Sequence, residues 1–154
     1  DMYFSVSATT RAPREGEVNG VNYHFITKAD FEERIKNNAM LEYAEFCGNY
    51  YGTPKREAME VLESGKNLIL EIEVDGARQV KKKFPAAVLI MLLPPSFATQ
   101  EMRLRNRGTE TEEKILARLE RTKEELKEAL GENVVVRQCN GCAVSQWEAK
   151  KAAK

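Results

Sequence analysis

The segment NLILEIEVDGARQVKKKFPAAVLIMLL, residues 67–93, decides the fold class. Its first part, residues 67–74, predicts a strand, and the part around Ala77 and Val80 predicts a helix. The final run, residues 86–93, is continuously apolar, which is typical of a strand buried on both faces of a parallel sheet. A strand, a helix and a strand in this order predict an α/β protein with a parallel sheet.

The residues before this segment predict a smaller, mainly β region. Residues 4–7 read FSVS, and residues 41–46 alternate between apolar and polar side chains before a Cys-Gly-Asn turn at 47–49. This pattern predicts a strand at 4–7 and a hairpin after residue 41. Thr27 is expected to cap a helix between them. The residues after the segment predict helices at 96–105 and 112–130 and a strand near 132–136.

Length and charge limit the possible functions. With 154 residues, of which 42% are hydrophobic, the chain is long enough to bury one core without disulfides. The formal net charge is zero, so no global basic surface points to a nucleic acid or membrane partner. Three cysteines do not make a disulfide framework, which favours a reducing compartment such as the cytoplasm. Any anion site must be a local group of arginines.

Such a group lies in the stretch FSVSATTRAPREGEVNGVNYHF, residues 4–25. Arg11 and Arg14 stand three residues apart beside Ser7 and neighbouring threonines. Guanidinium groups bind phosphate in a bidentate manner and keep their charge near neutral pH, so a pair of them suits a phosphomonoester. The alternative is a solvated loop with two surface arginines.

The chain resembles guanylate kinase over a succession of motifs. These are the stretch just quoted, followed by LEYAEFCGNYYGTP, LILEIEVDGARQV, LLPPS and RLRNRGTETEEKILARL, in that order. The resemblance implies a parallel-sheet P-loop nucleoside monophosphate kinase fold with an inserted, mainly β GMP-binding lobe and a helical lid. It also implies transfer of the γ-phosphate of ATP to GMP, with Mg²⁺ as cofactor. The expected divisions are a core of residues 1–7, 57–102 and 121–154, a lobe of residues 8–56 and a lid of residues 103–120.

The resemblance implies a set of phosphate-binding residues in the lobe. Each of them supplies a hydrogen-bond donor to the GMP phosphate: Ser7, Arg11, Arg14, Tyr23 and Tyr51. For the two tyrosines the alternative is ring packing within the β region.

Guanine presents N–H donors beside an acceptor oxygen, so a carboxylate and a hydroxyl can recognise it. By resemblance Glu42 supplies the carboxylate and Thr53 the hydroxyl, with Glu71 and Glu73 on the following strand. Without the resemblance, Glu42 would be interpreted as an exposed strand residue. Bacterial relatives commonly read EIDVQGA where this chain reads EIEVDGA, so Glu73 replaces the usual aspartate with a carboxylate one methylene longer.

On the ATP side, the resemblance implies that Arg103, Arg107 and Arg118 are catalytic lid residues that neutralise the transferring phosphates, and it counts Arg11 with them. For Arg118 the alternative is a salt bridge on a solvated helix. No protein metal site is predicted, and Mg²⁺ is expected to come with ATP.

The phosphate-loop motif G-x-x-x-x-G-K-[ST] does not occur in the 154 residues. In this family it precedes the equivalent of Asp1, so we expect these residues alone to bind GMP without turning it over. A different alternative is a guanylate-kinase-like module that binds phosphorylated peptides and lacks catalysis. Cys139 and Cys142 form one CxxC, expected to be two free thiols, with a metal or redox role as the alternative. The oligomeric state is left open.

Overall fold

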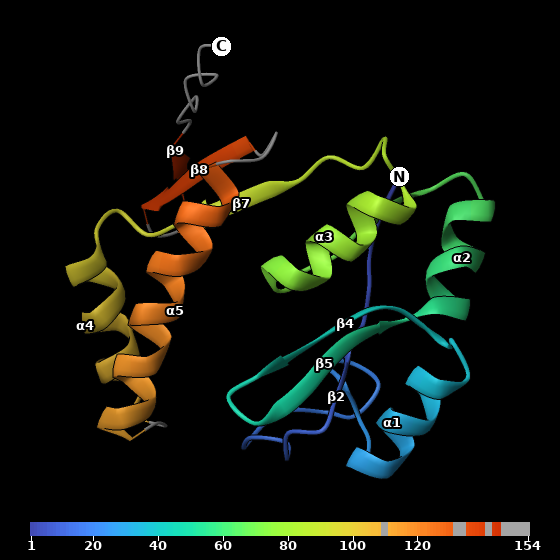
Figure 1. Ribbon diagram of the computed structural model, residues 1–154, viewed down its shortest axis with the longest axis horizontal. Coiled ribbons are helices and arrows are strands. Elements are labelled where there is room, and N and C mark those ends of the chain that lie inside the picture. Colours follow the sequence, from blue (N-terminus) through green and yellow to red (C-terminus); the bar gives the residue numbers. More distant parts are fainter. Residues whose placement is uncertain (109–110, 131–134, 141–142, 146–154) are drawn as a thin grey trace. The chain divides into compact units, whose positions relative to one another are not determined.

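The structure is a computed structural model, and it describes residues 1–108, 111–130, 135–140 and 143–145. It divides into two compact units, residues 1–85 and 86–154, which are described separately (Figure 1). The division into core, lobe and lid stays a prediction.

The first unit contains two sheets. A parallel pair joins β1 (Met2–Phe4) to β6 (Asn67–Ile69). The second sheet has four strands in the order β3-β2-β5-β4. These strands are β3 (His24–Phe25), β2 (Ala8–Thr9), β5 (Asn49–Pro54) and β4 (Met40–Phe46). The predicted strand at residues 4–7 is therefore displaced, because β1 ends at Phe4 and β2 begins only at Ala8.

The β4–β5 hairpin is confirmed as predicted. Phe46 pairs with Asn49, so the loop between the strands holds only Cys47 and Gly48. Their φ angles are 50° and 76°, and two positive φ angles match the twist of an antiparallel hairpin. The tight loop fixes the register of β4 against β5, which decides the side chains that share a face.

Helix α1 (Lys28–Lys36) covers one face of the four-stranded sheet (Figure 1). The Thr27 hydroxyl accepts a hydrogen bond from the Asp30 N–H at 3.1 Å, which confirms the predicted cap. Phe31 is fully buried and stacks on Tyr50 with ring centroids 5.2 Å apart. Together with Ala8 and Met40, Phe31 forms the core of this unit.

Strand β6 is shorter than the sequence predicts. The parallel register with β1 ends at Phe4 and Ile69, and the Ser5 N–H makes the last bond, to the Ile69 carbonyl, at 3.0 Å. Residues 70–73 leave the ladder, so Glu71 and Glu73 follow the strand and do not lie on it. Two helices flank this segment, α2 (Lys55–Glu63) before β6 and α3 (Val74–Lys83) after it.

The second unit combines a three-stranded sheet with a helical hairpin. Its strands are β7 (Ile90–Leu93), β8 (Val135–Asn140) and β9 (Ala143–Ser145), and its helices are α4 (Phe97–Arg107) and α5 (Glu112–Leu130). Strand β7 is parallel to β8, while β9 is antiparallel to β8. The parallel β7–β8 pair agrees with the predicted parallel sheet.

The expectation that β7 is buried on both faces is wrong for the described structure. Ile90 is 59% exposed and Leu92 61% exposed, while Met91 and Leu93 between them are half-buried. Alternate side chains of a strand point to opposite faces, so one face of β7 is left uncovered by the described residues.

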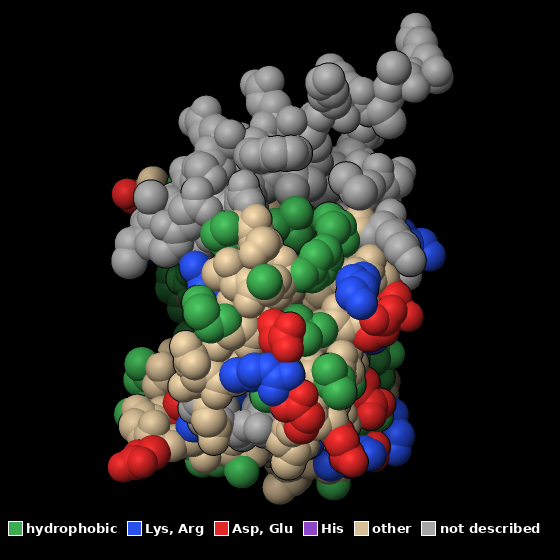
Figure 2. All heavy atoms as spheres, turned by 90° about the vertical axis from the view of Figure 1, so that its left-hand side faces the viewer, with side chains coloured by type: hydrophobic (Ala, Val, Ile, Leu, Met, Phe, Trp, Pro, Cys, Tyr) green, Lys and Arg blue, Asp and Glu red, His purple; other side chains and the backbone are tan. Residues whose placement is uncertain are grey.

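Figure 2, which shows the side of the molecule at the left of Figure 1, has acidic and basic side chains lying next to one another. Among the described residues, no helix is long and apolar enough to span a bilayer.

We predict that Phe31→Ala destabilises the first unit by about 3–5 kcal/mol, because it removes a buried ring and leaves a cavity under Tyr50. Urea unfolding followed by circular dichroism measures this change. Val21→Ala is the control, since Val21 is 68% exposed, and it should change stability by less than about 0.5 kcal/mol. A similar loss in both variants would show that Phe31 is not the centre of this core.

Candidate functional site

One face of the four-stranded sheet carries three of the predicted ligand-binding residues of the first unit, Glu42, Tyr51 and Thr53. Glu42 pairs with Thr53 across β4 and β5, and Thr9 pairs with both Tyr51 and Phe25. Directly paired residues point to the same face of a sheet. We call this face, defined by Phe25, Glu42, Tyr51 and Thr53, the site face.

The Arg11 guanidinium lies over aromatic rings of the site face. Its Cζ atom is 5.5 Å from the centre of the Tyr23 ring and 5.7 Å from that of Phe25. The Tyr23 and Tyr51 rings meet edge-on with their centroids 6.2 Å apart. Cation–π contact and ring packing thus hold the arginine and both tyrosines in one cluster. The rings of both tyrosines pack together, as the ring-packing alternative states. This packing also places the tyrosine hydroxyls beside Arg11.

Glu17 organises the arginine loop, and the sequence analysis missed it. Its carboxylate accepts hydrogen bonds from Arg11 Nη1 at 2.9 Å and from Nη2 at 2.8 Å. It also accepts one from the Arg14 N–H at 2.7 Å. These bonds, with the one from Arg11 first, lower the pKa of Glu17. The sequence signal for this role of Glu17 was its position as an acidic residue shortly after two arginines in the same loop.

The two loop arginines differ in exposure. The Arg11 side chain is 16% exposed, so the alternative of a solvated surface arginine does not describe this residue, whereas Arg14 is exposed. Glu17 and the Ala12 carbonyl engage Nη1 and Nη2 of Arg11.

Ser7 and Glu71 lie near this cluster. Ser7 directly precedes β2, is half-buried, and its carbonyl accepts a hydrogen bond from the His24 N–H at 2.9 Å. Burial raises the pKa of Tyr23, and the charge of Glu71 raises it further, which puts Glu71 within electrostatic reach of the Tyr23 hydroxyl. Glu73 is half-buried at the N-cap of α3, and its side chain makes no capping bond.

Glu42 and Thr53 form a buried pair. The Thr53 hydroxyl donates to Glu42 Oε1 at 2.6 Å, and the two residues are 2% and 0% exposed. Glu42 is therefore not the exposed strand residue that its pattern alone suggests. Burial raises the pKa of the Glu42 carboxyl, while the Thr53 hydrogen bonds and the charge of Lys83 oppose this effect. A carboxylate held next to a hydroxyl is an arrangement able to accept the N–H donors of a purine.

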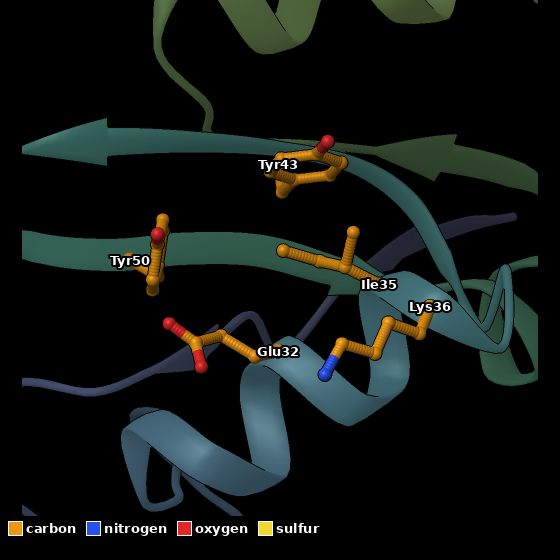
Figure 3. Close-up of a pocket in the computed structure, with 5 residues that line it drawn as sticks. All are labelled: Glu32, Ile35, Lys36, Tyr43 and Tyr50. Carbon is orange, nitrogen blue, oxygen red and sulfur yellow. The ribbon is translucent and has the colours of Figure 1, made fainter.

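A pocket of about 290 Å³ lies on the opposite face of the same sheet. Figure 3 shows its lining residues on α1 and on the β4–β5 hairpin: Glu32, Ile35, Lys36, Tyr43 and Tyr50. Tyr43 neighbours Glu42 in β4 and so points away from the site face. This pocket is separate from the Glu42–Thr53 pair.

The predicted lid arginines lie on the helical hairpin of the second unit. Gln100 Nε2 donates to the Thr122 hydroxyl at 2.8 Å, which sets the register of α4 against α5. Arg103 follows Gln100 by three residues and Arg118 precedes Thr122 by four, so both half-buried arginines lie about one turn from this contact. Arg107 is the last residue of α4, and its side chain is outside the described part of the structure.

Arg105, which the sequence analysis did not select, joins the two helices of this hairpin. Its Nε and Nη2 atoms donate to Glu101 Oε1 at 3.0 and 2.8 Å, and its Nη1 and Nη2 atoms donate to Glu112. These carboxylates, with Glu112 first, raise the pKa of Arg105. Gly108, at φ 62°, turns the chain between the helices. Arg105 is thus engaged within the hairpin.

The described residues contain no group of three or more His, Cys, Asp or Glu side chains placed to hold a metal ion. Of the CxxC pair, Cys142 and the side chain of Cys139 lie outside the described residues. Cys47, in the hairpin turn, is an exposed free thiol.

Comparisons with known proteins identify relatives of this chain. The guanylate kinase of Nostoc sp. is 53% identical over 129 residues, which are 84% of this chain and 65% of that relative. The guanylate kinase of Halalkalibacterium halodurans is 53% identical over 82% of this chain and 62% of its own length. A crystal structure of guanylate kinase from Anaplasma phagocytophilum aligns with a TM-score of 0.71 at 29% identity, covering 91% of this chain and 68% of that one.

Fold and site together define the class as an α/β protein of the P-loop nucleoside monophosphate kinase fold. A family model described as guanylate kinase matches residues 1–140. The chain belongs to the guanylate kinase family. It spans about 65% of the length of the Nostoc relative and 62% of the Halalkalibacterium relative.

We predict that Glu42→Gln changes how stability depends on pH. The folded-state pKa of the Glu42 carboxyl is raised above its ordinary value of 4.5. The wild-type fold therefore loses stability as the pH rises from the ordinary pKa through the raised one. Glutamine keeps the acceptor for Thr53 and carries no charge, so the variant should be more stable than wild type at pH 7 and no more stable at pH 4.

Urea unfolding at the two pH values measures this difference. The matched control is Glu45→Gln, three residues along the same strand, where the side chain is exposed. A gain at pH 7 that persists unchanged at pH 4 would contradict the role of a buried charge at Glu42.

Proposed function

We propose that this chain supplies the GMP-binding site of a guanylate kinase, which transfers the γ-phosphate of ATP to GMP and gives GDP and ADP. The observation that carries the proposal is the site face itself, where a cluster of arginine and tyrosine side chains lies on the same sheet as the buried Glu42–Thr53 pair. Purine nucleotide metabolism in the cytoplasm is the corresponding setting.

The phosphate of GMP would bind at the arginine loop. Arg11 and Arg14 would together neutralise the two charges of a phosphomonoester, with the hydroxyls of Ser7, Tyr23 and Tyr51 as directional donors. Glu17 bonds to both arginines and so supports the loop in the form that receives the anion.

The base would be selected by Glu42 and Thr53. Glu42 accepts from the N1–H and N2–H donors of guanine, whereas adenine presents its own N1 acceptor to the carboxylate and leaves it unpaired. An unpaired buried polar group costs roughly 1–3 kcal/mol, which corresponds to discrimination of about 5- to 150-fold. Glu71 and Glu73, at the end of β6, would face the same ligand.

The transferred phosphoryl group would be stabilised by Arg103, Arg107, Arg118 and Arg11. Phosphoryl transfer depends mainly on positioning and charge neutralisation, which guanidinium groups provide. Mg²⁺ would enter bound to ATP. The motif that cradles ATP phosphates is not among the 154 residues, so GMP binding is the part of the activity that these residues can test directly.

Isothermal titration of the chain with GMP tests the proposal, with AMP as the comparison. Saturable binding that prefers GMP over AMP is the expected result, and equal or undetectable binding of both would overturn it. A phosphoserine peptide titrated in parallel tests the binding-module alternative. The retained Arg11, Arg14, Glu42 and Thr53 favour the nucleotide over the peptide.

Arg14→Ala should weaken the binding of GMP and AMP alike, by about 10- to 100-fold, because it removes a charge-assisted contact to the phosphate and none to the base. Titration calorimetry with both nucleotides measures the change. Arg56→Ala on α2, whose side chain is 86% exposed, is the matched control. Unchanged GMP affinity in the Arg14 variant would contradict this role.

Glu42→Gln should reduce the preference for GMP over AMP by about 5- to 150-fold, since the amide replaces one acceptor by a donor. The ratio of the two dissociation constants measures the effect, and Glu45→Gln should leave that ratio unchanged. An equal loss of affinity for both nucleotides in the Glu42 variant would mean that this carboxylate does not recognise the base.

A further inference from the structure

Two neighbouring threonines attach the arginine loop to strand β5. Thr9 ends β2, and Thr10 follows it directly before Arg11. The Thr10 N–H donates to the Tyr50 carbonyl at 3.1 Å, and the Tyr50 N–H donates to the Thr10 hydroxyl at 2.9 Å. The Thr10 hydroxyl takes the place of a backbone acceptor here, so the contact with β5 continues one residue beyond the end of β2.

The Thr9 hydroxyl makes the second attachment, and it reaches two segments of the chain at once. It donates to the Tyr50 carbonyl at 3.0 Å and accepts a hydrogen bond from the Arg11 N–H at 3.2 Å. Thr9 is fully buried. Because a hydroxyl can donate and accept together, this one group connects the backbone of β5 to the backbone of Arg11.

Each end of this bridge belongs to a predicted phosphate-binding residue. One end is the N–H of Arg11, and the other is the carbonyl of the peptide bond between Tyr50 and Tyr51. The side chains of Arg11 and Tyr51 meet in the cluster around the Tyr23 ring. The Thr9 hydroxyl therefore sets the distance between the two backbones that carry them, and a binding group must be held to within about 0.5 Å to receive a ligand well.

Removing this hydroxyl should affect the arginine loop more than the base-reading pair. The Tyr50 carbonyl keeps its bond from the Thr10 N–H, whereas the Arg11 N–H loses the acceptor described above. The Glu42–Thr53 pair is held by its own hydrogen bond, which does not involve Thr9. A change at Thr9 should thus separate phosphate binding from recognition of the base.

We propose that Thr9 is a positioning residue of the phosphate site, whose buried hydroxyl holds the Arg11 backbone at the distance from β5 at which Arg11 and Tyr51 receive one phosphate. The proposal rests on the proposed function. Since Thr9 is fully buried, it acts through Arg11 and not by its own contact with the ligand.

Thr9→Val and Thr9→Ser in the 154-residue chain test the proposal by NMR titration with GMP and with guanosine, which lacks the phosphate. Valine keeps the shape of threonine without the hydroxyl, whereas serine keeps the hydroxyl. Thr9→Val should weaken GMP binding by about 3- to 10-fold, the range of one neutral hydrogen bond, and leave guanosine binding unchanged. Thr9→Ser should bind GMP to within about 2-fold of the unsubstituted chain.

Three results of this titration would overturn the proposal. They are unchanged GMP affinity in Thr9→Val, an equal loss for GMP and guanosine, and a loss in Thr9→Ser as large as that in Thr9→Val.

Thr27→Val is the control for a general loss of stability. It removes the hydroxyl that caps α1 through Asp30, so it should lower the urea midpoint of unfolding and leave GMP affinity unchanged. A loss of GMP affinity equal to that in Thr9→Val would mean that destabilisation explains both variants, and the positioning role would be wrong.

A measurement on the unsubstituted chain does not depend on how the variants fold. Hydrogen exchange of the Arg11 amide, followed by NMR, should be slower than in an unstructured peptide and should not become faster when GMP saturates the chain, because the bond to Thr9 persists. Faster exchange in the complex would overturn the proposal. If the unsubstituted chain does not bind GMP at all, the proposed function itself fails, whereas a chain that binds GMP equally well with valine at this position refutes the role of Thr9 alone.

Discussion

The register of the β4–β5 hairpin is the constraint on which the site depends. A two-residue loop pairs Phe46 with Asn49, and from there the ladder sets Glu42 opposite Thr53. A shift of one residue would send both side chains to the face that α1 covers. The pairing of β2 with β5 then brings the arginine loop to the same face, since Arg11 follows β2 by two residues.

Polar groups on the site face are held by other polar groups before any ligand is present. The Glu17 carboxylate accepts from the Arg11 guanidinium and from the Arg14 backbone N–H, and the Thr53 hydroxyl donates to Glu42. Each bond keeps a charged side chain oriented in a partly buried setting, so less side-chain entropy remains to be lost when a ligand binds. The raised pKa of Glu42 indicates that burying its carboxylate has a cost in stability. At Glu42, the burial that prepares the carboxylate to recognise a base therefore lowers the stability of the fold.

The helical hairpin of the second unit shows how neighbouring arginines can serve different purposes. Arg105 is engaged by Glu101 and Glu112 and connects α4 to α5. Arg103 and Arg118 lie about one turn from the Gln100–Thr122 contact, on the facing sides of the two helices. Spacing along the chain does not distinguish these roles, because all of these arginines stand within a few residues of acidic side chains.

The sequence by itself determined the α/β class, the Thr27 cap, the β4–β5 hairpin and the family, because each depends on local pattern or on motifs in order. Only the tertiary structure decided that β6 ends at Ile69, because a strand extends only as far as its partner. It also revealed the Glu17 contacts and the close approach of Gly76 to Glu42. Gly76 and Glu42 are distant in sequence, and no local pattern reports that a helix backbone will lie against a carboxylate.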